Sequence, residues 1–427
     1  MATVHIIGAG LAGLSAAVEL SQHTNFQIAL YETSDHAGGR CRSFYDSILG
    51  CEIDNGNHLI LGANKYLFRF LNFVNPDDIS SGFFSPSNPA IPFIDLKNNH
   101  RWLVHPKKSF FPYNLIEKKY HIPGQDLASY YQILKLLKAN HKKTLHSYLP
   151  LNNAFTKNFW EPLCLAIMNA HLDEASAILF VNVLKKVFFN GKDAYQPFLA
   201  YQGLSHALIE PALKFLKNKN IPIHYHASLK RIESRNTKIS DLYFGNEQIT
   251  LAQDDKVIFA LPPFALTKII PALDVPKEYR SIINIHMILP KPLNNVGEVK
   301  IIGLINSYSQ WVFCRHNILS ITISAADSLL NLSDDELSTL VWPEMKKTLN
   351  VEFQYILPAD FIPTIRIIRE KRATFLQTPL NISKRPNPSI FLSNTFLAGD
   401  WINTQLPATI EGAVYSGVLA VQELCKK

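Results

Sequence analysis

Glycine residues and an acidic residue near the N-terminus have the types and spacing that suit a phosphate-containing dinucleotide. The apolar run 4–7 leads directly into Gly8-Ala9-Gly10-Leu11-Ala12-Gly13, and residues 14–20 follow with helical spacing. A second apolar run, 27–31, ends at Glu32, 19 residues after Gly13. The order strand, glycine turn, helix, strand and acid is typical of a dinucleotide-binding unit.

Each position in this unit has a chemical reason. Gly8 permits a tight turn, Gly10 lets the backbone approach a pyrophosphate, and Gly13 lets the helix pack closely on the strands. The helix then begins with Leu11 and Ala12, and its free N–H groups and positive dipole end face the phosphates. Glu32 can accept hydrogen bonds from ribose hydroxyl groups. The alternative is a chance glycine turn followed by a surface glutamate.

A second glycine pair narrows the choice of cofactor. Gly38 and Gly39 would let the backbone press against a phosphate or a flavin edge, and Arg40 adds positive charge. With this Gly-Gly-Arg after the acid, the sequence resembles the FAD flavoproteins of the amine-oxidase and phytoene-desaturase type. The resemblance implies FAD as the cofactor, rather than NAD.

The C-terminal region is expected to complete the same site. Gly399-Asp400 follows an apolar run, and a helix from about residue 409 to 424 comes after Pro407. The resemblance implies that Gly399 and Asp400 meet the ribityl and pyrophosphate region, with Ala408, Thr409 and Ile410 near the flavin ring. In similar flavoproteins, two middle strands, 221–227 and 256–263, flank the adenine end, and Leu229 supplies a backbone contact.

The expected fold class is α/β. A Rossmann-like FAD-binding domain with three layers and a mostly parallel sheet would come from residues 1–75, 205–265 and 390–427. An inserted α+β substrate domain would come from 76–204 and 266–389. At 427 residues the chain is long enough for two or three structural units.

Three further stretches, taken with 406–413, make the resemblance more specific: 54–62, which begins Asp54-Asn55-Gly56-Asn57-His58, then 160–169 and 371–379. The resemblance is most specific in 54–62 and 399–417. With these, the sequence resembles the hydroxysqualene dehydroxylase family of squalene-associated flavoproteins. Asn57 replaces a glutamine that is common in that family, Ala170-His171 replaces Thr-Pro, and 402–405 also departs from the usual pattern. The last two departures lie where the substrate pocket is expected.

The resemblance implies removal of an allylic hydroxyl from a hydrophobic C30 isoprenoid alcohol, with flavin supplying the redox chemistry. A general acid should protonate the departing hydroxide. His58 is the first candidate, because the turn at Asn55-Gly56 should bring Gly56, Asn57 and His58 beside the flavin. A histidine that only holds this loop by hydrogen bonds is the alternative. Glu411 is a second catalytic candidate, although acids in a first helical turn ordinarily compensate the dipole.

Charge is concentrated in one segment. Residues 101–147 hold nine basic and two acidic side chains, which accounts for the whole net charge of +7. Aromatic residues are interspersed there, so contact with an anionic membrane surface is one interpretation and a solvated helix face is the other. No nucleic-acid-binding motif accompanies the segment. The five cysteines suit neither a disulfide framework nor a metal site. We expect a cytoplasmic protein, peripheral to the inner face of the membrane if it binds one.

Three other functions remain open from the sequence. A phytoene-type polyene desaturase or a flavin amine oxidase would share the fold. A non-catalytic prenyl-lipid carrier is a more distant alternative, since such carriers keep the fold without flavin, whereas Glu32, Gly38-Gly39-Arg40 and Gly399-Asp400 are all present here.

Overall fold

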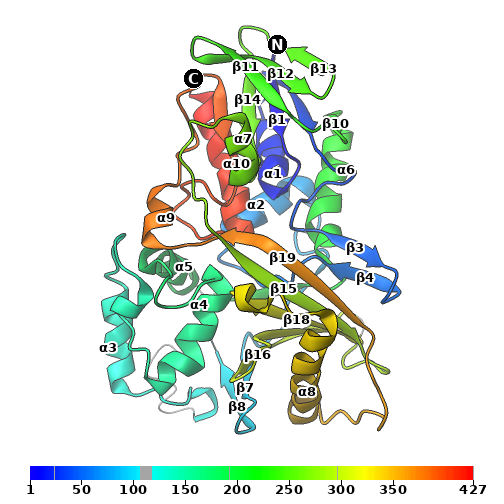
Figure 1. Ribbon diagram of the computed structural model, residues 1–427, viewed down its shortest axis with the longest axis vertical. Coiled ribbons are helices and arrows are strands. Elements are labelled where there is room, and N and C mark those ends of the chain that lie inside the picture. Colours follow the sequence, from blue (N-terminus) through cyan, green and yellow to red (C-terminus); the bar gives the residue numbers. More distant parts are fainter. Residues whose placement is uncertain (24, 106–117, 192, 296, 427) are drawn as a thin grey trace.

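The structure is a computed structural model that describes residues 1–23, 25–105, 118–191, 193–295 and 297–426. Figure 1 shows two halves. The upper half contains both termini and the helices α1 and α10, and the lower half contains the longest helix, α8. The long strands β15 and β19 run diagonally from one half toward the other.

A five-stranded parallel sheet forms the centre of the upper half, in the order β10-β2-β1-β14-β20. Its strands are mostly apolar where they pair, as is usual for parallel strands covered on both faces. The strand bounds are β1 Ala2–Ile7, β2 Phe26–Tyr31, β10 Ile223–His224, β14 Lys256–Phe259 and β20 Thr395–Leu397. Of the two middle strands, β10 pairs with the outer edge of β2 and β14 pairs with β1, and their place at the adenine end stays a prediction.

Two further layers cover this sheet. Four helices form one hydrophobic core with one face of the sheet: α1 Leu11–Leu20, α2 Lys65–Val74, α6 Glu210–Asn218 and α10 Ile410–Cys425. The antiparallel strands β11 Arg231–Arg235, β12 Lys238–Phe244 and β13 Glu247–Thr250 cover the other face with α7, Pro263–Ile269. The three layers around a parallel sheet confirm the predicted α/β fold class.

A seven-stranded mixed sheet forms the centre of the lower half, in the order β19-β15-β18-β17-β16-β7-β8. Its strand bounds are β7 Ile91–Asp95, β8 His100–Val104, β15 Tyr279–Ile288, β16 Val299–Ile305, β17 Trp311–Arg315, β18 Ile318–Ser324 and β19 Ile365–Phe375. All seven strands lie within the two segments predicted to form the substrate domain. The domain boundaries themselves stay a prediction.

The two faces of this larger sheet differ. The helix α8, Asp334–Phe353, packs against one face through a core of aliphatic side chains. Part of the opposite face packs against α4 Glu161–Met168 and α5 Ala177–Phe189. Two smaller sheets complete the strands: β3 Ser43–Asp46 pairs with β4 Cys51–Asp54, and β9 Pro197–Ala200 lies between β5 Ile60–Leu61 and β6 Phe83–Phe84. Two further α-helices are α3 Leu127–Leu136 and α9 Pro379–Ser383, and the described residues also include the short helices Lys118–Tyr120, Leu145–Ser147, Thr156–Trp160, Ser205–Ile209 and Ala326–Leu329.

The close contact between α1 and α10 requires a residue without a side chain. A Cβ atom on Gly417 would lie 2.5 Å from the Ala12 carbonyl oxygen and 2.7 Å from the Ala16 backbone nitrogen. Both contacts are with backbone, which cannot swing away as a flexible side chain can. The first helix and the last helix of the chain therefore touch through their main chains.

Gly417→Val should separate these helices. We expect a loss of about 3 kcal/mol in the free energy of unfolding, at the upper end for an overpacked core, because α1 or α10 must shift. Urea unfolding measures it. Leu419→Val is the matched control, since Leu419 is only half-buried on the same helix. Equal stability of the Gly417 variant and the wild type would contradict the close contact.

Candidate active site

The first glycine turn leaves the N-terminus of α1 facing open space. Gly8 has a φ of 107° and donates its N–H to the Tyr31 carbonyl oxygen at 2.8 Å, which closes the turn. A Cβ on Gly13 would lie 1.9 Å from the Gly8 oxygen, so the helix sits directly on the turn. In contrast, a Cβ on Gly10 would meet nothing within 4 Å, and no side chain caps α1 there. This is a cradle with room for a phosphate.

The second glycine pair lies directly against the first turn. Gly38 donates its N–H to the Ala9 carbonyl oxygen at 2.9 Å, and a Cβ on Gly39 would lie 3.4 Å from Gly10 Cα. Gly38 and Gly39 both have positive φ, at 103° and 59°. At the end of β2, Glu32 Oε2 accepts a hydrogen bond from the Ala9 N–H at 2.9 Å. The predicted phosphate-binding and ribose-binding residues therefore form one continuous surface.

An ion pair joins the two ends of the chain at this surface. Arg40 Nη2 lies 2.8 Å from Asp400 Oδ2, across 360 residues of sequence, and Asp400 is buried. The Asp400 carboxylate raises the pKa of Arg40 further above its ordinary value. Gly399, with a φ of 145°, donates its N–H to Ser416 Oγ of α10 at 2.7 Å. These contacts place Gly399 and Asp400 beside the Gly-Gly-Arg turn.

Arg385 organises the loop that follows Asp400, and the sequence analysis missed it. Its buried guanidinium donates to the carbonyl oxygens of Leu406 at 2.8 Å and Trp401 at 3.3 Å, and also to those of Asp400 and Ile402. Burial lowers the pKa of Arg385 to about 10, which still leaves it charged at neutral pH. In sequence, it is a basic residue in a polar loop next to a proline, with no signal that it is buried.

Gln377 connects this loop to the helices of the lower half. Its Nε2 donates to the Met168 carbonyl oxygen at 2.7 Å, and its Oε1 accepts from the Ala408 N–H at 2.8 Å. Thr409 then caps α10 by accepting the Gly412 N–H at 3.2 Å, and Ile410 begins the helix. The predicted residues Ala408, Thr409 and Ile410 are therefore held in place from both halves of the molecule.

The Glu411 carboxylate accepts hydrogen bonds at the N-terminus of α2. Its two carboxylate oxygens accept the N–H groups of Tyr66 and Leu67, at 3.2 Å and 3.0 Å, and so cap that helix. The carboxylate is buried, which raises its pKa, and Lys186 Nζ lies 3.9 Å away. Glu411 does not line the cavity described next, so the structure places the two catalytic candidates in different surroundings.

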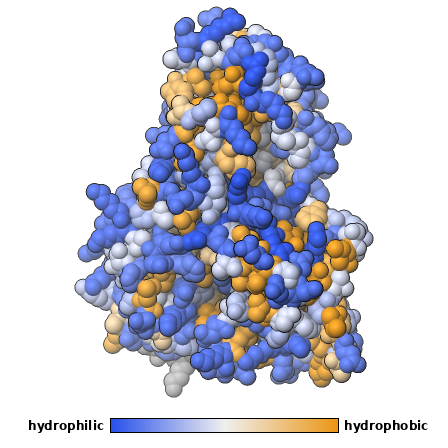
Figure 2. Space-filling model, in the orientation of Figure 1, coloured by the Kyte–Doolittle hydropathy of each residue, from blue (hydrophilic) through white to orange (hydrophobic). Residues whose placement is uncertain are grey.

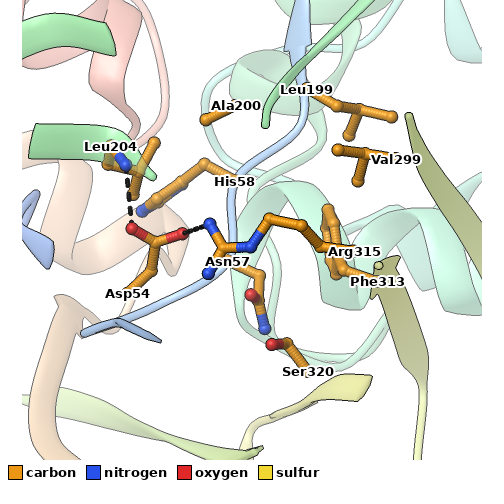
Figure 3. Close-up of a pocket in the computed structure, with 10 residues that line it drawn as sticks. All are labelled: Asp54, Asn57, His58, Leu199, Ala200, Leu204, Val299, Phe313, Arg315 and Ser320. Carbon is orange, nitrogen blue, oxygen red and sulfur yellow. Dashed lines mark hydrogen bonds and ion pairs between the residues drawn. The ribbon is translucent and has the colours of Figure 1, made fainter. Parts of the chain in front are cut away.

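A small cavity of about 20 Å³, with room for a water-sized group, lies beside the 54–58 loop (Figure 3). Asp54 is held there by the Leu204 N–H at 2.8 Å, by Ser43 Oγ at 2.6 Å and by Arg315 Nη1 at 3.4 Å. The loop adjoins the second glycine pair, because Asn55 donates its N–H to the Arg42 carbonyl oxygen at 2.9 Å. The cavity lining is Asp54, Asn57, His58, Leu199, Ala200, Leu204, Val299, Phe313, Arg315 and Ser320.

Polar residues of the seven-stranded sheet support this loop from below. Asn57 Nδ2 donates to Thr322 Oγ1 at 3.0 Å, and Asn284 Nδ2 donates to the Asn55 carbonyl oxygen at 3.1 Å. A Cβ on Gly56 would be 3.4 Å from the same Asn284 nitrogen. In the neighbouring register pair, His286 Nδ1 lies 2.8 Å from Ser320 Oγ. The loop that carries the candidate residues therefore rests on β15 and β18.

Alternation in these strands could have revealed the polar face. In β15, Ile283, Ile285 and Met287 alternate with Asn284 and His286, and in β18 the residues Ser320, Thr322 and Ser324 alternate with aliphatic ones. A period of two indicates a strand with one polar face and one apolar face. In strands as rich in isoleucine as β15 and β18, the polar face is expected to be buried or to belong to a functional site.

Electrostatics favour neutral histidines at this site. The His58 residue is exposed to solvent at the cavity, and the protein atoms that pack around its ring lower its pKa. The Asp54 carboxylate opposes this shift, and Arg40 adds to it. His286 is fully buried, and burial likewise lowers its pKa to about 4. At neutral pH both rings are uncharged hydrogen-bonding groups.

The remaining predicted residues lie in the core. The side chains of Leu11 and Ala12 are buried in the helix layer, which leaves only their backbone for a ligand. Leu229 is buried beneath the antiparallel strands. Two residues before it, the Ala227 N–H donates a hydrogen bond to the Glu32 carbonyl oxygen at 2.8 Å, which ties this segment to the end of β2. The contact of Leu229 with adenine stays a prediction.

The basic segment 101–147 is described in part. Part of the segment lies outside the described residues, namely Lys107, Lys108, Phe110, Phe111 and Tyr113. The described part of the segment contains α3. Among the helices that the structure describes, none combines the length and apolar character needed to span a bilayer.

Burial of His286 should make stability depend on pH in a defined window. Its folded pKa of about 4 lies below the ordinary 6.5, so the unfolded chain takes up a proton first as pH falls. We expect up to about 3 kcal/mol of unfolding free energy to be lost between these two pH values, and the pH slope to be correspondingly shallower in His286→Asn. Denaturant unfolding across the window measures this. His224→Asn, at an exposed position, should keep the wild-type slope, and an unchanged slope in the His286 variant would contradict the assignment.

Comparison with known proteins agrees with this geometry. The model of the flavin-containing amine oxidoreductase family matches residues 11–425. The hydroxysqualene dehydroxylase of Sinorhizobium fredii is 35% identical over 414 residues, covering 97% of this chain and 96% of its own. That of Zymomonas mobilis is 34% identical over 420 residues, covering 98% of each. The 15-cis-phytoene desaturase of Synechococcus elongatus is more distant, at 23% over 469 residues.

Solved structures agree on the fold alone. Putrescine oxidase has a TM-score of 0.67 at 14% identity, and cyclohexylamine oxidase from Brevibacterium oxydans has 0.64 at 14%. Both comparisons cover 100% of this chain and 99% of the other. The chain therefore belongs to the flavin-containing amine oxidoreductase family, within its hydroxysqualene dehydroxylase group.

Proposed function

We propose that this protein is an FAD-dependent oxidoreductase that removes the allylic hydroxyl of hydroxysqualene and so produces squalene. Two relatives of that name align over nearly the whole chain. The observation that carries the proposal is the mixed lining of the cavity, in which half of the residues are polar and half apolar. A hydrocarbon with a single hydroxyl group needs apolar walls with a few placed polar groups.

The residues at the two glycine turns fit FAD. The uncapped N-terminus of α1 beside Gly10 suits the pyrophosphate, and Glu32 at the end of β2 suits a ribose. Arg40 and Asp400 extend the same surface toward the 54–58 loop. When bound, reduced FAD supplies the hydride that replaces the hydroxyl group. The cavity beside this surface is where we place the hydroxyl end of the substrate.

The protein must then move one proton and exclude water. Hydroxide is a poor leaving group, so its oxygen has to receive a proton as the bond to carbon breaks. His58 can supply this proton only from its protonated ring, a form that the Asp54 carboxylate favours, and the ring is left neutral when the C–O bond breaks and water departs. Leu199, Val299 and Phe313 line the other side of the cavity and keep water from the electron-poor carbon.

Glu411 has a different place in this scheme. Because both of its carboxylate oxygens accept N–H groups of α2, its contacts support a positioning role for the α2 and α10 N-termini. Direct proton transfer by Glu411 would first break these bonds. We therefore assign proton donation to His58 alone.

We also propose that the enzyme works at the surface of the membrane that holds its substrate, since a C30 alcohol is a lipid. Its place on the cytoplasmic side stays a prediction.

The function is tested by a single turnover with reduced enzyme. Purified protein should be yellow, and anaerobic incubation of its reduced form with hydroxysqualene should yield squalene and oxidised flavin in equal amounts. Gly10→Val should fill the space beside α1 and abolish both flavin binding and squalene formation. Ala252→Val, at an exposed position, should change neither. A colourless wild type, or yellow enzyme that leaves hydroxysqualene unchanged, would refute the proposal.

Replacing His58 tests the proton donor. We expect His58→Gln to retain FAD but to form squalene about 10² to 10⁴ times more slowly, the usual contribution of a positioned proton donor. Stopped-flow flavin oxidation at several pH values measures the rate. Asn98→Gln, in an exposed turn, is the control. A His58 variant within tenfold of the wild type, with the same pH profile, would leave His58 only as a residue that holds the loop.

A further inference from the structure

We propose that the outer face of α3 and the adjoining end of α5 dock this enzyme on an anionic lipid bilayer. We call this surface the α3 face and define it by Leu127, Tyr131, Leu134, Lys135, Lys138 and Phe189. The helix α3 lies at the left edge of the lower half in Figure 1, and Figure 2 shows hydrophilic and hydrophobic side chains mixed along that edge. The inference deepens the proposed function, because it names the partner that delivers the substrate.

The helix α3 presents large apolar side chains to solvent. Leu127 is 73% exposed, Tyr131 61% and Leu134 60%, and their spacing of four and three residues puts them on one side of the helix. The opposite side is buried, with Ser129 and Leu136 fully enclosed. Single exposed apolar residues are common on protein surfaces, but three aligned within eight residues indicate an interaction surface.

Lysines surround this apolar stripe. Lys135 and Lys138 are exposed beside it, and Lys142 and Lys143 follow in the next turn of chain. Lys135 Nζ lies 4.7 Å from the centre of the Tyr131 ring, which holds a cation next to an aromatic side chain. Asp126, the one acidic residue between 119 and 147, is engaged as the N-cap of α3 with the Ser129 N–H at 2.9 Å. The α3 face is therefore strongly positive.

The apolar surface continues into a groove between the ends of α3 and α5. Leu137, Lys185, Lys186, Phe189 and Asn190 line this groove, and Phe189 is 65% exposed at its rim. The same combination of aromatic and aliphatic side chains with lysines thus recurs on two neighbouring helices. Exposed apolar side chains and lysines on both helices can therefore contact the same bilayer.

The positive charge of the α3 face favours an anionic bilayer over a second copy of this chain as its partner. A second copy of this chain docked on the same face would bring two sets of lysines together without compensating acids, which costs free energy. An anionic bilayer matches both components: the lysines meet the headgroups, and Leu127, Tyr131, Leu134 and Phe189 enter the interfacial region. Such a surface lets a lipid substrate reach the enzyme without crossing water.

Vesicle co-sedimentation tests the docking separately from catalysis. Wild-type enzyme should bind phosphatidylcholine vesicles that contain phosphatidylglycerol and should bind pure phosphatidylcholine weakly. Lys135→Gln/Lys138→Gln should bind the anionic vesicles about 30-fold more weakly, which corresponds to about 1 kcal/mol per lysine. Leu127→Ser/Tyr131→Ser/Leu134→Ser should also lose most binding. Ile356→Ser/Ile362→Ser, at sites 91% and 83% exposed, is the control and should bind as the wild type does.

Circular dichroism and flavin content establish that each variant is folded, and squalene formation in detergent micelles should equal that of the wild type for all of them. Wild-type enzyme that ignores anionic vesicles, or variants that bind them normally, would overturn the docking surface even if the enzyme is active. Equal losses in the control variant would also overturn it, as would a wild-type dimer that the triple substitution dissociates. An enzyme that binds vesicles through the α3 face but forms no squalene would leave the docking intact and refute only the dehydroxylation.

Discussion

The site depends on how closely the backbones of distant segments approach one another. The N-terminus of α1 can face a ligand because Gly8 and Gly13 let the turn and helix share one small volume, and because α10 reaches α1 at Gly417 without a side chain between them. The ion pair from Arg40 to Asp400 then joins the second glycine turn to the chain just before α10. A side chain at any of these close contacts would open the cradle, whatever polar groups it kept.

Polar side chains in the interior hold the loops that hydrophobic packing cannot hold. The loop from Asp400 to Thr409 exposes many carbonyl groups to the interior, and an unsatisfied buried carbonyl costs free energy. Arg385 satisfies several of these carbonyls with one rigid guanidinium, and its own burial is tolerable because it donates to so many acceptors. Gln377 extends the same principle to the contact between this loop and α4. These ties fix the approach of the C-terminal segment to the glycine turns.

The sequence allowed the cofactor half to be predicted more completely than the substrate half, and the reason is physical. Glycine turns and the acid at Glu32 act through local backbone geometry, so their spacing along the chain carries the information. The cavity residues act through contacts between segments far apart, such as Asp54 with Arg315, and no local pattern announces such a pair. Arg385 was missed for the same reason. The alternation of Asn284 and His286 with isoleucines was readable, but on its own it does not say which loop the polar face supports.

The larger sheet reconciles two requirements that one face could not meet. The face of a sheet that binds a hydroxyl group needs polar side chains, whereas the face that packs in the core is stabilised by apolar side chains. In β15 and β18 the alternation of the pleat separates these needs: the isoleucines enter the core with α8, and Asn284, His286, Ser320 and Thr322 face the 54–58 loop. Farther along the same face, Val299 and Phe313 replace the polar residues, so the surface changes from hydrogen-bonding to apolar within the cavity itself. One sheet thereby supports the loop of the candidate proton donor and also provides the apolar wall where we propose that the hydrocarbon chain lies.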